Sequence, residues 1–126
     1  MEFYHHEVDN DVLIISADGG IDRHTSKEFV EQILKLIDGG MTKIIVDCNK
    51  LTYISSWGLG VLLRLHKRAK VAGGEVKIAA VHSRIVTLLN VTHLNKIFGI
   101  YPDVNRARLE FRPRDDRPAD KSDSPG

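Results

Sequence analysis

The chain has 126 residues, of which 42% are hydrophobic and 28% charged, a composition typical of one soluble globular domain with a real core. Its 18 basic and 17 acidic residues leave a net charge of +1, which argues against a nucleic-acid-binding protein that depends on phosphate contacts. No apolar run approaches the roughly 20 residues of a membrane helix, and the first residues lack the pattern of a secretory signal. We therefore expect a cytoplasmic protein without membrane insertion.

The N-terminal third of the chain predicts a β-hairpin followed by a helix. Two short β-prone stretches flank Asp9 and Asn10, a pair that suits a tight turn. The run from Thr25 to Glu28 fits a capping box, which marks the start of a helix whose apolar residues share one face. The expected elements are strands at 3–8 and 11–17 and a helix at 26–38.

Beyond Gly40, strand-like and helix-like patterns alternate. The run that ends at Cys48 is short, apolar and β-branched, as expected of a buried strand. Because Cys48 is the single cysteine, no intramolecular disulfide is possible, and we expect a small buried thiol in a reducing compartment. Ser83 is the expected cap of a third helix, and Pro102 suits the first turn of a last one. The expected elements are strands at 43–48, 75–81 and 97–101, a loop at 49–54, and helices at 57–72, from 83 onward and at 102–111.

The order of these elements, β-β-α-β-α-β-α-β-α, predicts a single α/β domain over residues 1–111. Strands separated by helices are joined by parallel crossovers, and the opening hairpin adds an antiparallel edge. The sheet should therefore be mixed and mostly parallel, with about five strands and about four helices. Residues 112–126 hold three of the four prolines and no large apolar side chain, so we expect a disordered polar tail.

One segment, Asp47 to Leu63, combines the end of a strand, a loop and the start of a helix, where α/β proteins commonly place their function. Ser56 stands at or next to the cap of that helix. A phosphate added there would meet free N–H groups and the positive end of the helix dipole, so the folded chain could accept it. Gly58 and Gly60 keep the first turn thin, which leaves room for another protein.

The run from Tyr53 to Leu63 resembles the signature of STAS domains, the fold of bacterial anti-sigma factor antagonists. The resemblance covers nearly the whole predicted domain, because four further motifs occur in the family's order. They are Gly20-Ile21-Asp22 with Thr25, Ile44 to Asp47, Gly73 to Ile78, and Leu94 to Phe98.

The resemblance implies a regulatory binding module and not an enzyme. The serine two positions before the first signature glycine is the family's phosphorylation site, and here it is Ser56. A serine kinase that is also the anti-sigma factor would modify it and then release it, and a PP2C-like phosphatase would restore it. The neighbours depart from the usual pattern, since Ser55 is a competing acceptor and Trp57 stands where a small residue is usual. Trp57 either anchors a partner or folds back onto the sheet.

We expect the partner to dock on a surface around Ser56. Its rim residues are predicted to be Asp22, Asn49, Ser55, Trp57, Gly58 and Leu59. The basic run from Arg64 to Lys70 is expected on the solvent side of its helix and could face an acidic partner.

The remaining patterns give no sign of a catalytic or metal site. The six histidines lack ligand-like spacing, and no nucleophile, base and orienting group occur together, so neither metal, cofactor nor enzyme activity is expected. Three alternatives to the phosphorylation switch stay open. They are an unphosphorylated STAS subunit of a signalling assembly, a lipid-transport accessory of the same fold, and a small-molecule or nucleotide sensor. The sequence also leaves the oligomeric state open between a monomer and a weak dimer.

Overall fold

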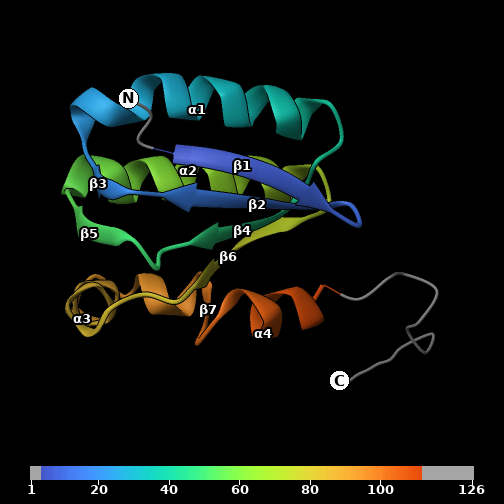
Figure 1. Cartoon of the computed structure of the whole chain (residues 1–126). Coiled ribbons are helices and arrows are strands. Elements are labelled where there is room, and N and C mark those ends of the chain that lie inside the picture. Colours follow the sequence, from blue (N-terminus) through green and yellow to red (C-terminus); the bar gives the residue numbers. More distant parts are fainter. Residues whose placement is uncertain (1–3, 112–126) are drawn as a thin grey trace.

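The computed structural model describes residues 4–111, so the predicted tail at 112–126 lies outside the described residues. A five-stranded sheet forms the middle layer of the domain, with α1 and α2 on one face and α4 on the other (Figure 1). The elements are β1 Tyr4–Asp9, β2 Val12–Ala17, β3 Gly19–Ile21, α1 Arg23–Asp38, β4 Lys43–Asp47, β5 Leu51–Ile54, α2 Ser56–Val71, β6 Glu75–Ala79, α3 Ser83–Val91, the 3-10 turn η1 Leu94–Lys96, β7 Gly99–Tyr101 and α4 Val104–Leu109.

The strand order is β1-β2-β4-β6-β7, with an antiparallel β1–β2 pair and parallel pairs throughout the rest. The predicted mixed, mostly parallel sheet of five strands with four helices is therefore confirmed. Parallel strands buried on both faces need apolar side chains on both sides, which explains why β4 is an unbroken apolar run from Ile44 to Val46.

A second sheet, which the sequence did not predict, consists of the short parallel strands β3 and β5. Residues 19–21 lie after the strand expected at 11–17, and residues 51–54 fall within the loop expected at 49–54. Strands of three and four residues are too short to give a periodic signal, so only their pairing in the folded chain identifies them.

The observed helix starts correct two predicted caps. Helix α1 begins at Arg23, so Thr25 lies inside the helix and not at its cap position. The carboxylate of Asp22 instead accepts a hydrogen bond from the backbone N–H of His24 at 2.8 Å. Helix α3 begins at Ser83 itself, after a cap residue that makes no side-chain capping bond.

Two further boundaries shift by a few residues. The hairpin turn falls on Asn10 and Asp11, one position later than predicted, and both have positive φ values of 51° and 65°. The last helix is shorter than expected, because Asp103 caps it by accepting the N–H of Arg106 at 2.8 Å.

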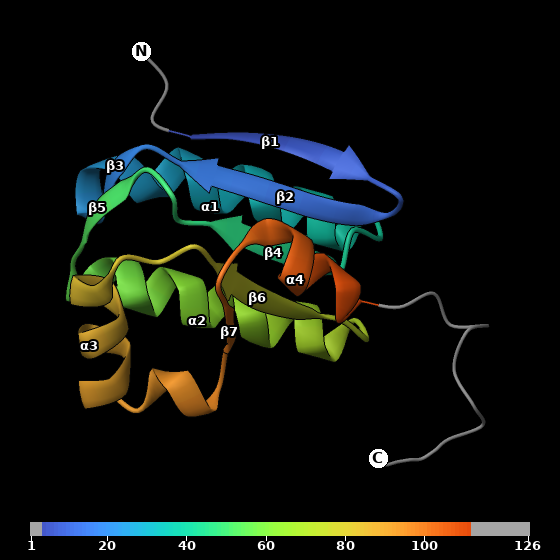
Figure 2. The ribbon, with the colours of Figure 1, turned by 60° about the horizontal axis from the view of Figure 1, so that its bottom comes forward.

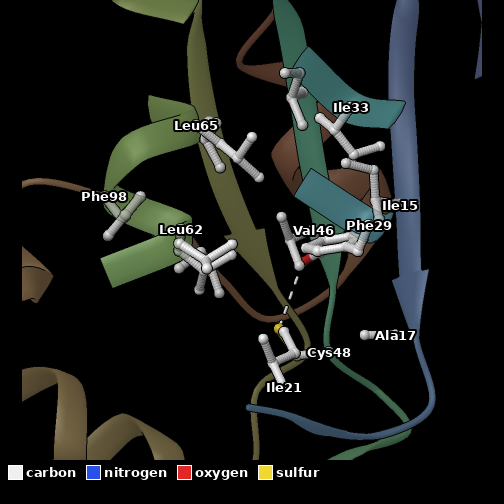
Figure 3. Packing of buried hydrophobic residues seen from close by; sticks show 14 of the residues in the cluster. Ile15, Ala17, Ile21, Phe29, Ile33, Val46, Cys48, Leu62, Leu65 and Phe98 are labelled. Atoms are coloured by element: carbon white, nitrogen blue, oxygen red, sulfur yellow. Dashed lines mark hydrogen bonds between the residues drawn. The ribbon is translucent and has the colours of Figure 1, made fainter. Parts of the chain in front are cut away.

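The main core lies between the sheet and the two helices α1 and α2 (Figure 3). Alternation along β2 sends Leu13 and Ile15 into this core and Val12 and Ile14 to the other face, under α4. The predicted buried thiol is confirmed, since Cys48 is 1% exposed and burial raises its pKa to about 12. Side chains that meet around it in Figure 3 include Ala17, Ile21, Phe29, Val46 and Leu62.

Candidate functional site

Helices α1 and α2 begin side by side, because each follows one strand of the small β3–β5 sheet. Ile21 and Ile54, the last residues of the two strands, are paired in register. The backbone N–H of Ser55 then donates to the carbonyl of Ile21 at 3.0 Å, which ties the start of α2 to the end of β3. Two helix N-termini, each with a partial positive charge, therefore lie next to each other at this end of the domain (Figure 2).

The two neighbouring serines occupy different positions at the start of α2. Ser55 is the N-cap, and its half-buried side-chain oxygen accepts the N–H of Gly58 at 3.1 Å. Its hydroxyl also contacts the carbonyl of Ile21 at 3.4 Å, where it can donate. Ser56 is the first helical residue and is exposed. Within residues 4–111 the Ser56 hydroxyl has no hydrogen-bond partner, whereas the Ser55 hydroxyl is occupied.

Trp57 packs against the start of α1 and does not fold back onto the sheet, so the second of the two expectations for it is wrong. Its indole Nε1–H donates to the buried hydroxyl oxygen of Ser26 at 3.0 Å. The guanidinium of Arg23 lies 5.1 Å from the centre of the ring. The indole is still 51% exposed, so one side of a fixed aromatic ring faces solvent next to Ser56.

Gly58 and Leu59 are buried, so the structure does not place these two predicted rim residues on the surface. A Cβ atom at position 58 would lie 2.5 Å from the carbonyl oxygen of Ile21 and 2.8 Å from a side-chain carbon of Ile54. Glycine is thus required here because the helix approaches β3 closely, and not because a partner needs the room. At Gly60, by contrast, a Cβ atom would have no neighbour within 4 Å, because this position faces open space.

Asp22 and Asn49, the other predicted rim residues, lie at different distances from Ser56 along the small sheet. Asp22 is partly exposed and follows β3, beside the start of α2. Asn49 is exposed but precedes β5, at the opposite end of that strand from Ser55. The backbone N–H of Asn49 donates to the carboxylate of Asp47 at 3.0 Å, and its carbonyl lies 2.9 Å from His82 Nε2.

Arg23 and Ser26 complete the surface around Ser56, and sequence patterns did not identify either of them. They lie about 30 residues from Trp57 in the chain, so only the parallel pairing of β3 with β5 brings them together. One local signal was available for Ser26, because its spacing from Phe29 and Ile33 puts a polar residue on the apolar face of α1. In the structure Ser26 is only 1% exposed.

The basic run on α2 does not stay together as one solvent-exposed group. Arg64, Lys67 and Arg68 are exposed, but His66 is buried and its Nδ1 accepts the N–H of Val76 at 3.1 Å. Burial lowers the pKa of His66 below its ordinary value. The position of His66 in the solvated stripe was therefore wrongly predicted.

The described residues contain no cluster of three or more His, Cys, Asp or Glu side chains that could hold a metal ion. None of the helices between residues 4 and 111 is both long and apolar enough to cross a membrane.

Comparison with known proteins identifies relatives over nearly the whole described chain. The STAS domain family matches residues 5–107. The anti-sigma F factor antagonist of Paenibacillus polymyxa is 32% identical over 112 residues, which cover 88% of this chain and 93% of that protein. The anti-sigma-B factor antagonist of Bacillus subtilis is 28% identical over 92 residues, which cover 73% of this chain and 83% of the relative.

Solved structures share the same fold at low sequence identity. An anti-sigma factor antagonist from Mycobacterium paratuberculosis superposes with a TM-score of 0.78 at 21% identity, over 87% of this chain and 93% of the other. The Bacillus cell fate determinant SpoIIAA in its phosphorylated form gives a TM-score of 0.71 at 19% identity, over 86% and 99% of the two chains.

Proposed function

This chain belongs to the STAS domain family, and from that premise we propose that it is an anti-sigma factor antagonist switched by phosphorylation of Ser56. Unphosphorylated, it binds an anti-sigma factor that is also a serine kinase, and the sigma factor is freed. Phosphorylated, it leaves that kinase, and a PP2C-like phosphatase removes the phosphate. Regulation of a sigma factor also requires the protein to be in the cytoplasm, where transcription takes place.

The observation that carries the proposal is the different use of the two adjacent hydroxyls. Ser55 caps α2 and its oxygen is engaged with Gly58 and Ile21, so its phosphorylation would remove a helix cap. Ser56 is exposed at the first helical position, where a kinase can reach it without unfolding the helix. This geometry favours Ser56 as the acceptor.

The phosphoryl transfer itself needs nothing from this chain beyond the Ser56 hydroxyl. The Ser56 oxygen attacks the γ-phosphorus of ATP, the bond to ADP breaks, and the hydroxyl proton passes to a base of the kinase. In this proposal the chain is the substrate of an enzyme and has no catalytic activity of its own.

A phosphate at Ser56 can be tolerated by the folded protein and still disrupt a complex. The first turn of α2 and the adjacent start of α1 present positive dipole ends to the added charge of about −1.5 to −2. At a contact surface the same charge must be desolvated, and a loss of about 3 kcal/mol lowers affinity more than a hundredfold. The proposed docking surface comprises Asp22, Ser55, Ser56 and Trp57, with Asn49 at its far edge and Gly58 and Leu59 supporting it from below.

The test is phosphorylation of the purified protein by candidate anti-sigma kinases with magnesium and ATP, read by intact mass. We expect one phosphate on the wild type and none on Ser56→Ala. Ser55→Ala is the matched control, and it should still accept phosphate although loss of the cap costs about 0.5–2 kcal/mol of stability. Phosphate that persists on Ser56→Ala would contradict the assignment.

A second measurement tests the release step. Ser56→Asp should bind the same kinase at least about tenfold more weakly than wild type, because a charge at this position opposes docking. Equal affinity of the two forms would remove the electrostatic basis of the switch.

A further inference from the structure

The solvent-exposed face of α2 begins at Ser56 and carries a groove further along. Ser56, Gly60, Arg64, Lys67 and Val71 follow one another at spacings of three or four residues, which places them in one row on the helix. A surface groove of about 410 Å³ runs along this row. Its lining residues, which we call the α2 groove, are Gly60, Leu63, Arg64, Lys67, Arg68 and Val71.

The rim of the α2 groove is positively charged and only partly neutralised. Helix α2 contains no acidic residue. Arg68 donates to the carboxylate of Asp38 on α1 at 2.8 Å, which offsets its charge. Arg64 and Lys67 are exposed and form no ion pair with any residue between 4 and 111.

Two apolar side chains, Leu63 and Val71, are among the residues that line the groove. Leu63 is half-buried, and Val71 is 87% exposed. Gly60 lacks a side chain and faces open space, so the groove stays open toward the Ser56 end of the helix. Apolar side chains beside exposed cations fit an amphipathic helix that carries apolar side chains flanked by carboxylates.

We propose that the α2 groove docks an acidic amphipathic helix of the anti-sigma factor kinase, an inference that rests on the function proposed above. The occupant is a protein helix and not a membrane, because only two unpaired cations and one largely exposed aliphatic residue face outward along this row. Ser56 heads the same row, so its phosphate meets one end of that acidic helix. Repulsion between the Ser56 phosphate and the carboxylates of the docked helix then weakens a complex that opposite charges stabilise.

The test is the affinity of the kinase that phosphorylates Ser56 for a charge-reversed variant, Arg64→Glu with Lys67→Glu. We expect the dissociation constant to rise at least about tenfold, with a smaller salt dependence than wild type. The matched control is Lys27→Glu with Lys35→Glu, which reverses two exposed lysines on α1 and should change the constant by no more than about twofold. Thermal unfolding of each variant verifies that the fold is retained.

The outcomes separate this inference from the proposed function. If the kinase binds and phosphorylates both double variants as it does the wild type, the groove proposal is wrong and the Ser56 switch stands. If no kinase modifies Ser56, the proposed function fails, and the groove is tested with a synthetic helical peptide that carries leucine and glutamate on one face. If the peptide shifts the backbone amide resonances of residues 60–71 in the wild type but not in the double variant Arg64→Glu with Lys67→Glu, the groove proposal is supported. Three results would overturn the groove proposal. They are no amide shifts with the glutamate peptide, equal shifts with a peptide that carries lysine in place of glutamate, and tighter binding of the protein to phosphatidylserine vesicles than to the glutamate peptide.

Discussion

At the scale of single residues, two glycines in the first turns of α2 have opposite reasons to be glycine. A Cβ at position 58 would collide with backbone and side-chain atoms of β3 and β5, whereas a Cβ at position 60 meets nothing within 4 Å. The sequence shows the same residue type at both sites, and only the approach of β3 to the helix distinguishes them.

Gly58→Ala should therefore destabilise the protein by about 1–3 kcal/mol, because the overlap forces α2 away from Ile21. Gly60→Ala is the control in the same helix. It should stabilise the protein by about 0.5–1 kcal/mol, since alanine loses less backbone entropy on folding. Urea unfolding measures both, and equal effects of the two substitutions would refute the packing argument.

At the scale of elements, His66 joins α2 to β6 through a bond that only the neutral imidazole can make. Its Nδ1 accepts the N–H of Val76 at 3.1 Å, and its ring lies edge-to-face with Phe98 at 5.0 Å. Burial lowers its pKa, nearby Glu75 opposes that effect, and Lys70 and Lys77 add to it. A protonated ring would lose the hydrogen bond from Val76.

The free energy of unfolding should fall as the pH drops below about 6.5, the ordinary histidine pKa. In the window between the lowered folded pKa and that ordinary value, the unfolded chain binds a proton that the folded chain does not. The slope from this one group cannot exceed about 1.4 kcal/mol per pH unit. Denaturant titrations of wild type and His66→Gln, spread over roughly three pH units around the histidine pKa, should differ in slope. Parallel curves would show that His66 does not titrate on unfolding.

At the scale of the whole molecule, one face of the sheet is covered by the short helix α4 and the residues around it. Ala107, Val104 and Phe111 lie over Val12 and Ile45 on this face. Two charged contacts hold the cover in place. Arg108 pairs with Asp9 of the hairpin, and the buried Lys77 ammonium lies 4.7 Å from the ring of Phe111.

Two truncations test this cover. A chain that ends at Phe111 should unfold at the same denaturant concentration as the full chain, because the sequence predicts no core residue beyond it. A chain that ends at Asp103 should lose about 3 kcal/mol, the burial of roughly two large apolar side chains, and should bind a hydrophobic dye. Equal stability of the two truncated chains would mean that α4 contributes nothing to the fold.

Local sequence patterns correctly predicted the alternation of strands and helices and the mixed sheet, and they predicted a start for α2 at Trp57, one residue after the observed start at Ser56. These features follow from local periodicity, glycine breaks and apolar runs, which act over a few residues. Tertiary structure decided the pairing of β3 with β5, the separation of Asn49 from Ser56 and the placement of Arg23 and Ser26 against Trp57. The β3–β5 pairing and the contacts of Trp57 join segments about 30 residues apart, and no local pattern encodes which distant backbone a short strand will meet.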